Sequence, residues 1–191
     1  MRWLLLLAAL PAPVFGCPTA NDMERGVVFY RTDGATEVHR TLPDGMSVVD
    51  VSYSDGSKDQ NTFFYGVFIN SLASVENGVV NLADAWVYAY RSIPPVPASN
   101  TSGKLTAQTG KKVDGLFREV QTFKWGPLTN TTIGGCNYQL IEGQFNYEGR
   151  DYVAEELIHY LPELGTGLLM RYSDDSGADA DIYEFNRVIA R

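Results

Sequence analysis

The sequence has 191 residues, a formal net charge of −8 at pH 7, and 45% hydrophobic residues. An acidic chain repels phosphate backbones, and no cluster of lysine and arginine interrupts its negative field, so nucleic acid is not an expected partner. The hydrophobic fraction is that of a globular protein and excludes wholesale disorder.

Residues 1–16 have the pattern of a secretory signal peptide: one positive charge at Arg2, a short apolar block over residues 4–10, and the small residue Gly16 before a plausible cleavage point. The apolar block is too short to cross a bilayer, which takes about 20 residues. We therefore expect a periplasmic or secreted protein whose mature chain is residues 17–191. Its formal net charge would be −9, because Arg2 leaves with the leader, and we expect no transmembrane segment in it.

Cys17 could be lipidated or could form a disulfide. Gly16-Cys17 resembles the end of a bacterial lipoprotein leader, in which the cysteine is lipidated and the protein becomes an outer-membrane lipoprotein, although Phe15 does not suit that motif. The chain has two cysteines, Cys17 and Cys136, and an even number in an exported protein favours a disulfide. Such a bridge would stabilise the fold by about 4–5 kcal/mol in the chain-entropy model. We favour the disulfide and keep lipidation as the alternative.

The best helical signal covers Thr19–Arg25. Thr19 can cap the segment, Asp22 and Glu24 suit its first turns, and Gly26 can end it. This predicts one short N-terminal helix of two turns at most.

After Gly26 the sequence predicts strands. Val49, Val51 and Tyr53 alternate with polar residues, which indicates a strand with one buried face. The segment 63–69 is apolar on both faces and predicts a covered central strand, and residues 80–90 predict one long strand. Further alternating segments cover residues 117–125, 138–147, 152–160, 168–172 and 183–189.

Short turns follow several of these segments and predict hairpins. Asp-Gly and similar pairs supply the positive φ values of tight hairpin turns, and they occur at residues 33–34, 55–56, 148–149 and 176–177. We therefore predict an all-β fold, an antiparallel meander of nine or ten strands that curls into a barrel or half-barrel. The Pro-rich segment 92–103 could link two domains, but we predict a loop within a single antiparallel β domain of residues 17–191, because each half alone would have open edges.

The two histidines and two acidic segments are the candidate ligands or catalytic groups of the sequence. His159 shares a strand face with Glu155, but two ligands are too few for zinc, and we expect a surface pair. We expect His39 to be a solvated side chain. Two acidic segments, 55–61 and 174–181, suggest calcium loops, but the first lacks the required glycine and final glutamate, and the second is better explained as a solvated turn. We assign no catalytic, cofactor-binding or metal residue, and Cys17 with Cys136 is the single assigned site.

The C-terminal sequence Tyr160-Leu-Pro-Glu-Leu-Gly165 resembles the corner of many small exported (periplasmic) β-rich proteins of alphaproteobacteria, themselves uncharacterised. In that corner one strand ends at the proline and the next begins after the glycine, because proline cannot continue a ladder and glycine can adopt positive φ. The resemblance covers about thirty residues and implies no activity, cofactor or site residue.

These observations favour an exported, non-catalytic cell-envelope protein that binds an apolar ligand or a protein partner on a curved sheet. One alternative is a lipid-anchored outer-membrane assembly accessory. The other is a hydrolase, whose site would have to be built from dispersed residues because the nucleophile-elbow, Cys-x-x-Cys and His-Glu-x-x-His motifs are absent. A deep apolar cavity in the sheet would favour a ligand, and a filled interior would favour a partner.

Overall fold

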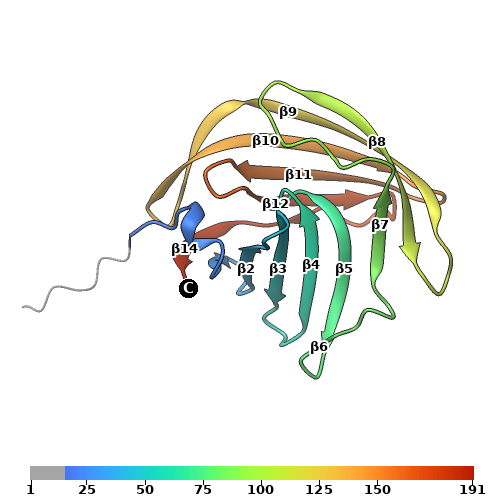
Figure 1. Ribbon diagram of the computed structural model, residues 1–191, viewed down its shortest axis with the longest axis horizontal. Coiled ribbons are helices and arrows are strands. Elements are labelled where there is room, and N and C mark those ends of the chain that lie inside the picture. The colour runs from blue at the N-terminus through green and yellow to red at the C-terminus, as the bar shows by residue number, and fades with distance from the viewer. Residues whose placement is uncertain (1–15) are drawn as a thin grey trace, which may run out of the picture.

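The computed structural model describes residues 16–191, and its strands form one antiparallel sheet (Figure 1). The predicted signal peptide lies outside the described residues except for Gly16. A 3₁₀ turn, η1 (Ala20–Asp22), precedes the strands β1 (Val27–Arg31), β2 (Thr36–Thr41), β3 (Met46–Ser52), β4 (Lys58–Phe64), β5 (Phe68–Glu76), β6 (Val79–Val80), β7 (Trp86–Tyr90), β8 (Ser102–Lys111), β9 (Phe117–Ile133), β10 (Cys136–Glu148), β11 (Val153–Leu161), β12 (Thr166–Asp174), β13 (Asp181–Ile182) and β14 (Phe185–Ala190).

The predicted antiparallel meander is confirmed, although the described residues form fourteen strands and not the nine or ten predicted. The strand order is β13-β12-β11-β10-β9-β8-β7-β5-β4-β3-β2-β1-β14, with β6 paired to β5 alone. Strand β14 is the exception, because the chain passes from β13 at one edge of the sheet to β14 beside β1 at the other. Two consecutive residues span these edges: Tyr183 N–H donates to Met170 O, and Glu184 O accepts from Thr32 N–H. No ladder joins β13 to β14 in the described residues, so the sheet is a half-barrel.

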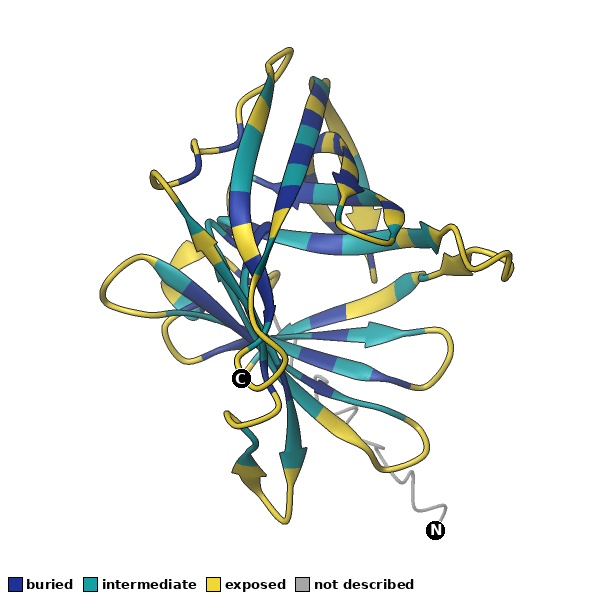
Figure 2. Ribbon diagram, turned by 90° about the vertical axis from the view of Figure 1, so that its right-hand side faces the viewer, coloured by how far each residue is buried: buried dark blue, intermediate teal, exposed yellow. Residues whose placement is uncertain are grey.

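The sheet curls over itself, so that β2–β5 run across β9–β12 (Figure 1). Aromatic rings join the two groups: Phe68 on β5 meets Phe145 on β10 edge-on, with 5.6 Å between ring centroids. The hairpin loops at the periphery are exposed, whereas buried residues recur at intervals along the strands (Figure 2). This follows from the two-residue period of a strand, which sends alternate side chains inward.

Two glycines fix where the two groups of strands touch. The tip of the β4–β5 hairpin meets the β11–β12 corner, where Gly167 N–H donates a 3.0 Å hydrogen bond to Gly66 O. A Cβ on Gly66 would lie 2.6 Å from the Thr166 Cα, and one on Gly167 would lie 2.6 Å from Val67 Cγ1. Neither position has room for a side chain, so this close contact requires glycine on both sides.

The predicted strand over residues 63–69 is wrong. Strand β4 ends at Phe64, Tyr65 and Gly66 form a turn with φ values of 53° and 68°, and β5 begins at Phe68. The segment is apolar because its tip is buried against the β11–β12 corner: Val67 is 2% exposed. An apolar run alone does not separate a buried hairpin tip from a covered strand.

The predicted long strand over residues 80–90 is also interrupted. Only β6 and β7 are formed there, and the turn between them leaves Leu82 69% exposed. The Pro-rich segment that follows connects β7 to β8, and its last two residues, Ser102 and Gly103, already belong to β8. Because β7 and β8 are neighbours in the sheet, the segment is a loop within it.

The N-terminal helix is shorter than predicted, a single 3₁₀ turn. The Asp22 carboxylate accepts hydrogen bonds of 2.9 Å from both the backbone N–H and the hydroxyl of Thr19. Gly26, with φ of +121°, then turns the chain into β1. At the other end of the chain the predicted corner is present: β11 ends at Leu161, Gly165 has φ of +65°, and β12 begins at Thr166.

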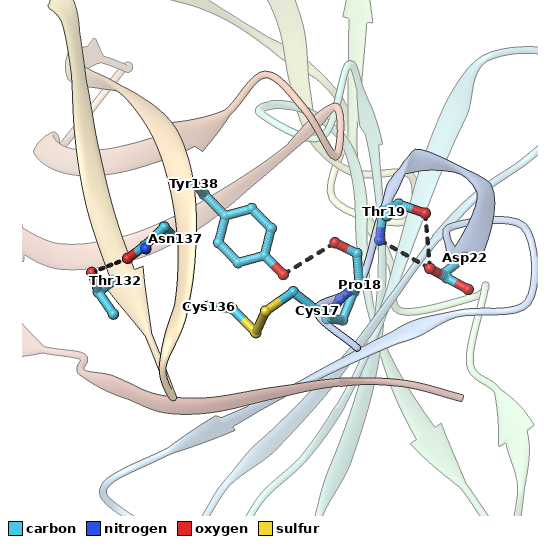
Figure 3. Close-up of a disulfide and its surroundings, with 8 residues drawn as sticks. All are labelled: Cys17, Pro18, Thr19, Asp22, Thr132, Cys136, Asn137 and Tyr138. Atoms are coloured by element: carbon cyan, nitrogen blue, oxygen red, sulfur yellow. Dashed lines mark hydrogen bonds between the residues drawn. A yellow bond between two sulfur atoms is a disulfide. The ribbon is translucent and has the colours of Figure 1, made fainter. Parts of the chain in front are cut away.

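The predicted Cys17–Cys136 disulfide is formed (Figure 3). Its Cα atoms are 5.5 Å apart and its cysteines are separated by 119 residues in the sequence. Beside it, the Tyr138 hydroxyl donates a 3.2 Å hydrogen bond to Pro18 O, so the N-terminal segment is held against the start of β10. In this bonded form the Cys17 sulfur is not available for lipidation. Within residues 16–191, no helix has the length and apolar character needed to cross a membrane.

Candidate functional site

A cavity of about 600 Å³ lies on the concave side of the curled sheet. It is enclosed from one side by residues of β1–β5 and from the other by residues of β10–β12, with Trp86 and Tyr88 of β7 between them. This volume is within the range of about 300–1,000 Å³ that is typical of small-molecule sites.

The inward alternation of the strands explains the apolar character of the wall. Val49 and Val51 of β3 and Ile158 of β11 are buried side chains that face the cavity. Two small residues also line the cavity: Ala154, which stands opposite Tyr147 in the β10–β11 ladder, and Gly167 at the β11–β12 corner. Six tyrosines contribute rings to the wall: Tyr53, Tyr88, Tyr147, Tyr152, Tyr172 and Tyr183.

Three of these tyrosines donate hydrogen bonds to carboxylates that also line the cavity. Their hydroxyl-to-carboxylate distances are 2.9 Å for Tyr53–Asp59, 2.6 Å for Tyr147–Glu156 and 3.3 Å for Tyr172–Asp174. Burial and the neighbouring Asp174 raise the pKa of Tyr172 to about 12, so its hydroxyl remains a donor at neutral pH. Burial likewise raises the pKa of Tyr53 and Tyr147. Each pair therefore presents a phenol ring with an acceptor group beside it.

Glu156 is the most perturbed carboxyl in the wall. Burial raises its pKa to about 7, and the hydrogen bond from Tyr147 opposes that rise. Its neighbour Glu119 on β9 is fully buried, and burial raises its pKa to about 7 as well. Glu119 Oε1 accepts a 2.7 Å hydrogen bond from Gln121, and its Oε2 has no hydrogen-bond partner among the described residues. Both carboxyls therefore change charge near neutral pH.

The one arginine in the cavity wall is already paired. Arg31 forms ion pairs with Asp33 and, at 3.4 Å, with Glu37. Its guanidinium also lies over the Tyr183 ring, 4.2 Å from the centroid. Two carboxylates neutralise this cation, so it adds little positive field to the cavity.

The prediction that His39 is solvated is wrong, because its side chain is only 1% exposed. Its Nδ1 lies 2.7 Å from Thr166 Oγ1 and its Nε2 lies 2.9 Å from Glu37 Oε2. In the sequence His39 stands between Val38 and Arg40, which gave no sign of its burial. His39 and Glu37 are two residues apart on β2, so both side chains point inward. There each provides a hydrogen-bond partner for the other.

The chain Thr166–His39–Glu37 has the order of a nucleophile, a base and an orienting carboxylate. Thr166, however, is fully buried under Gly66 and is not part of the cavity wall. A nucleophile must reach its substrate, so this geometry supports a structural role, in which His39 joins β2 to the β11–β12 corner.

His159, the other histidine considered from the sequence, does not lie beside its predicted partner. His159 Nε2 lies 3.9 Å from Glu142 Oε2, not beside Glu155, because the β10–β11 register places Glu142 opposite His159. Burial lowers the pKa of His159. Among residues 16–191, no three His, Cys, Asp or Glu side chains gather in a group suited to a metal ion.

The two acidic segments are divided between the cavity and the surface. Asp59, Asn61 and Asp174 line the cavity, whereas Asp55 and Ser57 bond to each other in the exposed β3–β4 turn. Neither segment was assigned to a cavity from the sequence.

Sequence reasoning also missed the tyrosine–carboxylate pairs. Their partners are two, six and nine residues apart, so no fixed spacing identifies them. A signal was present on β9, where Glu119 and Gln121 occupy inward positions between Phe117 and Phe123. Polar residues in the apolar register of a strand indicate an interior that is not pure core.

Comparisons with protein-family models, with curated proteins and with solved structures gave no match.

Proposed function

We propose that this protein is an exported binding protein that holds a small, largely apolar ligand in the cavity of its curled sheet. The observation that carries the proposal is the cavity itself, about 600 Å³ in volume and walled by valine, isoleucine, leucine and aromatic side chains. Apolar walls with a few convergent polar groups are typical of small-molecule sites. A concave site suits a small ligand better than the flat surface of a protein partner.

Export is supported by the leader pattern of residues 1–16 and by the disulfide. Disulfides persist in oxidising compartments such as the periplasm and are rare in the cytosol. The Cys17–Cys136 bond supports a free periplasmic or secreted protein over a lipid-anchored one, because one sulfur cannot carry both bonds.

A neutral apolar dye tests the proposal. N-phenylnaphthylamine fluoresces more strongly in an apolar site, and we expect saturable binding of about one dye per chain with micromolar affinity. Replacing a wall residue with a larger one, Leu169→Trp, should fill part of the cavity and weaken binding by about tenfold or more.

The matched control is Val153→Trp, which adds the same bulk at an exposed position of the neighbouring strand β11. This variant should bind the dye as the parent does. If neither protein binds the dye, or if both tryptophan variants lose it equally, the proposed cavity site is wrong.

A further inference from the structure

We propose that the ligand of this cavity is an organic cation: an apolar or aromatic body that carries one positively charged nitrogen. This inference rests on the proposed function, since it names the chemical class that the same cavity would select.

The first support is the charge of the wall. Four of its side chains carry carboxyl groups, Glu37, Asp59, Glu156 and Asp174, and its one arginine is paired with Glu37 and Asp33. His39 also contacts Glu37, which leaves the other three carboxyl groups without a cationic partner from the described residues. Their hydrogen-bond donors within the cavity wall are tyrosine hydroxyls, which do not neutralise a negative charge. A cation in the cavity would complement this field, and an anion would be repelled by it.

The second support is the set of aromatic rings. Tyr53, Tyr147 and Tyr172 each stand beside one of these carboxylates, so ring and charge are presented together. The face of a tyrosine ring attracts a cation, and ammonium ligands are recognised by cages of such rings. The wall already shows this chemistry within the protein, where the Arg31 guanidinium lies over Tyr183.

The third support is the position of Glu156. It lies in the middle of the β10–β11–β12 wall, opposite Phe145 on one side and Tyr172 on the other. Besides burial, its carboxylate raises the pKa of the titratable groups around it: Tyr147 of β10, Tyr172 of β12, Tyr88 and Tyr90 of β7, and Glu119 of β9. Across the cavity stand Arg31, Glu37, His39 and Asp59.

These surroundings leave Glu156 with no cation of its own. A bound cation would hold it ionised, and binding should therefore strengthen as the pH rises through about 7, where Glu156 loses its proton.

The test uses three ligands that share a naphthyl group and differ in charge: the cation naphthylmethyl-trimethylammonium, the neutral naphthylmethanol and the anion naphthylacetate. At about pH 8 we expect the cation to bind at least about tenfold more tightly than the alcohol, and the anion to bind more weakly than the alcohol. Calorimetry gives all three affinities. The quaternary ammonium keeps its charge at every pH, so a rise in its affinity between about pH 5.5 and pH 8 reports on the protein.

Glu156→Gln should reduce the ratio of cation to alcohol affinity by about fivefold or more. Asp59→Asn, on the opposite wall, tests the same preference independently, and Glu155→Gln, exposed and outside the cavity wall, is the control that should leave the ratio unchanged.

Equal affinity for the three ligands, tighter binding of the anion, or an unchanged ratio in both cavity variants would overturn the inference. Binding of the neutral dye without binding of the cation would overturn it while leaving the proposed function intact. Failure of the dye and all three ligands to bind would refute both.

Discussion

The hydroxyl of Tyr147 donates a 2.6 Å hydrogen bond to Oε2 of Glu156, between adjacent strands of the cavity wall. This donor favours the ionised carboxylate, whereas burial favours the protonated acid. The charge of Glu156 near neutral pH therefore depends on the Tyr147 hydroxyl.

Tyr147→Phe should raise the pKa of Glu156 above about 7, because the hydrogen bond that opposes the effect of burial is removed. We expect a loss of about 1–3 kcal/mol in the free energy of unfolding at about pH 8, and a smaller loss at about pH 5, where Glu156 is protonated. Urea denaturation at the two pH values measures both. Tyr152→Phe is the control, because Tyr152 lines the cavity but donates to no carboxylate of the described residues. An equal loss at both pH values would contradict the assignment.

Glu119→Gln should stabilise the protein at alkaline pH. In the folded state Glu119 keeps its proton up to about pH 7, whereas its ordinary pKa is 4.5. The folded state therefore binds more protons than the unfolded state in this window, and stability falls as the pH rises through it.

The variant should gain up to about 3 kcal/mol over the parent at about pH 8 and little at about pH 4. Thermal melts across this range test the sign. Glu155→Gln, at an exposed position, should show no such pH-dependent gain.

The close contact between Gly66 and the β11–β12 corner should be intolerant of any side chain. Gly66→Ala would place a Cβ 2.6 Å from the Thr166 backbone, in addition to the strain of φ near +68°. Gly45→Ala is the matched control, since Gly45 has φ of +82° and no heavy atom within 4 Å of the added Cβ. We expect Gly45→Ala to cost about 1 kcal/mol and Gly66→Ala at least about 2 kcal/mol more, measured by denaturant unfolding. Equal losses would show that the contact is not tight.

The disulfide should appear in the mass of the mature protein, which is expected to increase by the mass of two hydrogens on reduction. Reduction, or Cys17→Ser with Cys136→Ser, should lower the free energy of unfolding by about 2–5 kcal/mol. A mass that carries a lipid adduct on Cys17 would instead support the outer-membrane lipoprotein alternative.

The strand content, the meander and the disulfide could be predicted because they depend on local sequence patterns or on the number of cysteines. The alternation at Val49 and Val51, the turn at Asp55-Gly56 and the count of two cysteines each constrain one answer. The turn at Gly66 was missed because its burial depends on the β11–β12 corner, about a hundred residues later in the chain.

The cavity depends on long-range geometry in the same way. His39 meets Thr166 across 127 residues, and this contact follows from the curl of the sheet. The carboxyl groups of Glu119 and Glu156 were visible in the sequence as polar residues on apolar strands. Their grouping with tyrosines of β7, β10 and β12 required the register of the whole sheet.

The most direct test of ligand binding in the cavity is a methyl NMR titration with the neutral dye N-phenylnaphthylamine. We expect saturable shifts of the Val49, Val51, Ile69 and Leu72 methyl groups, which line the cavity, and unchanged shifts of the exposed Val153 and Ile182 methyl groups. Shifts confined to Val153 and Ile182, or no saturable shift at all, would contradict it.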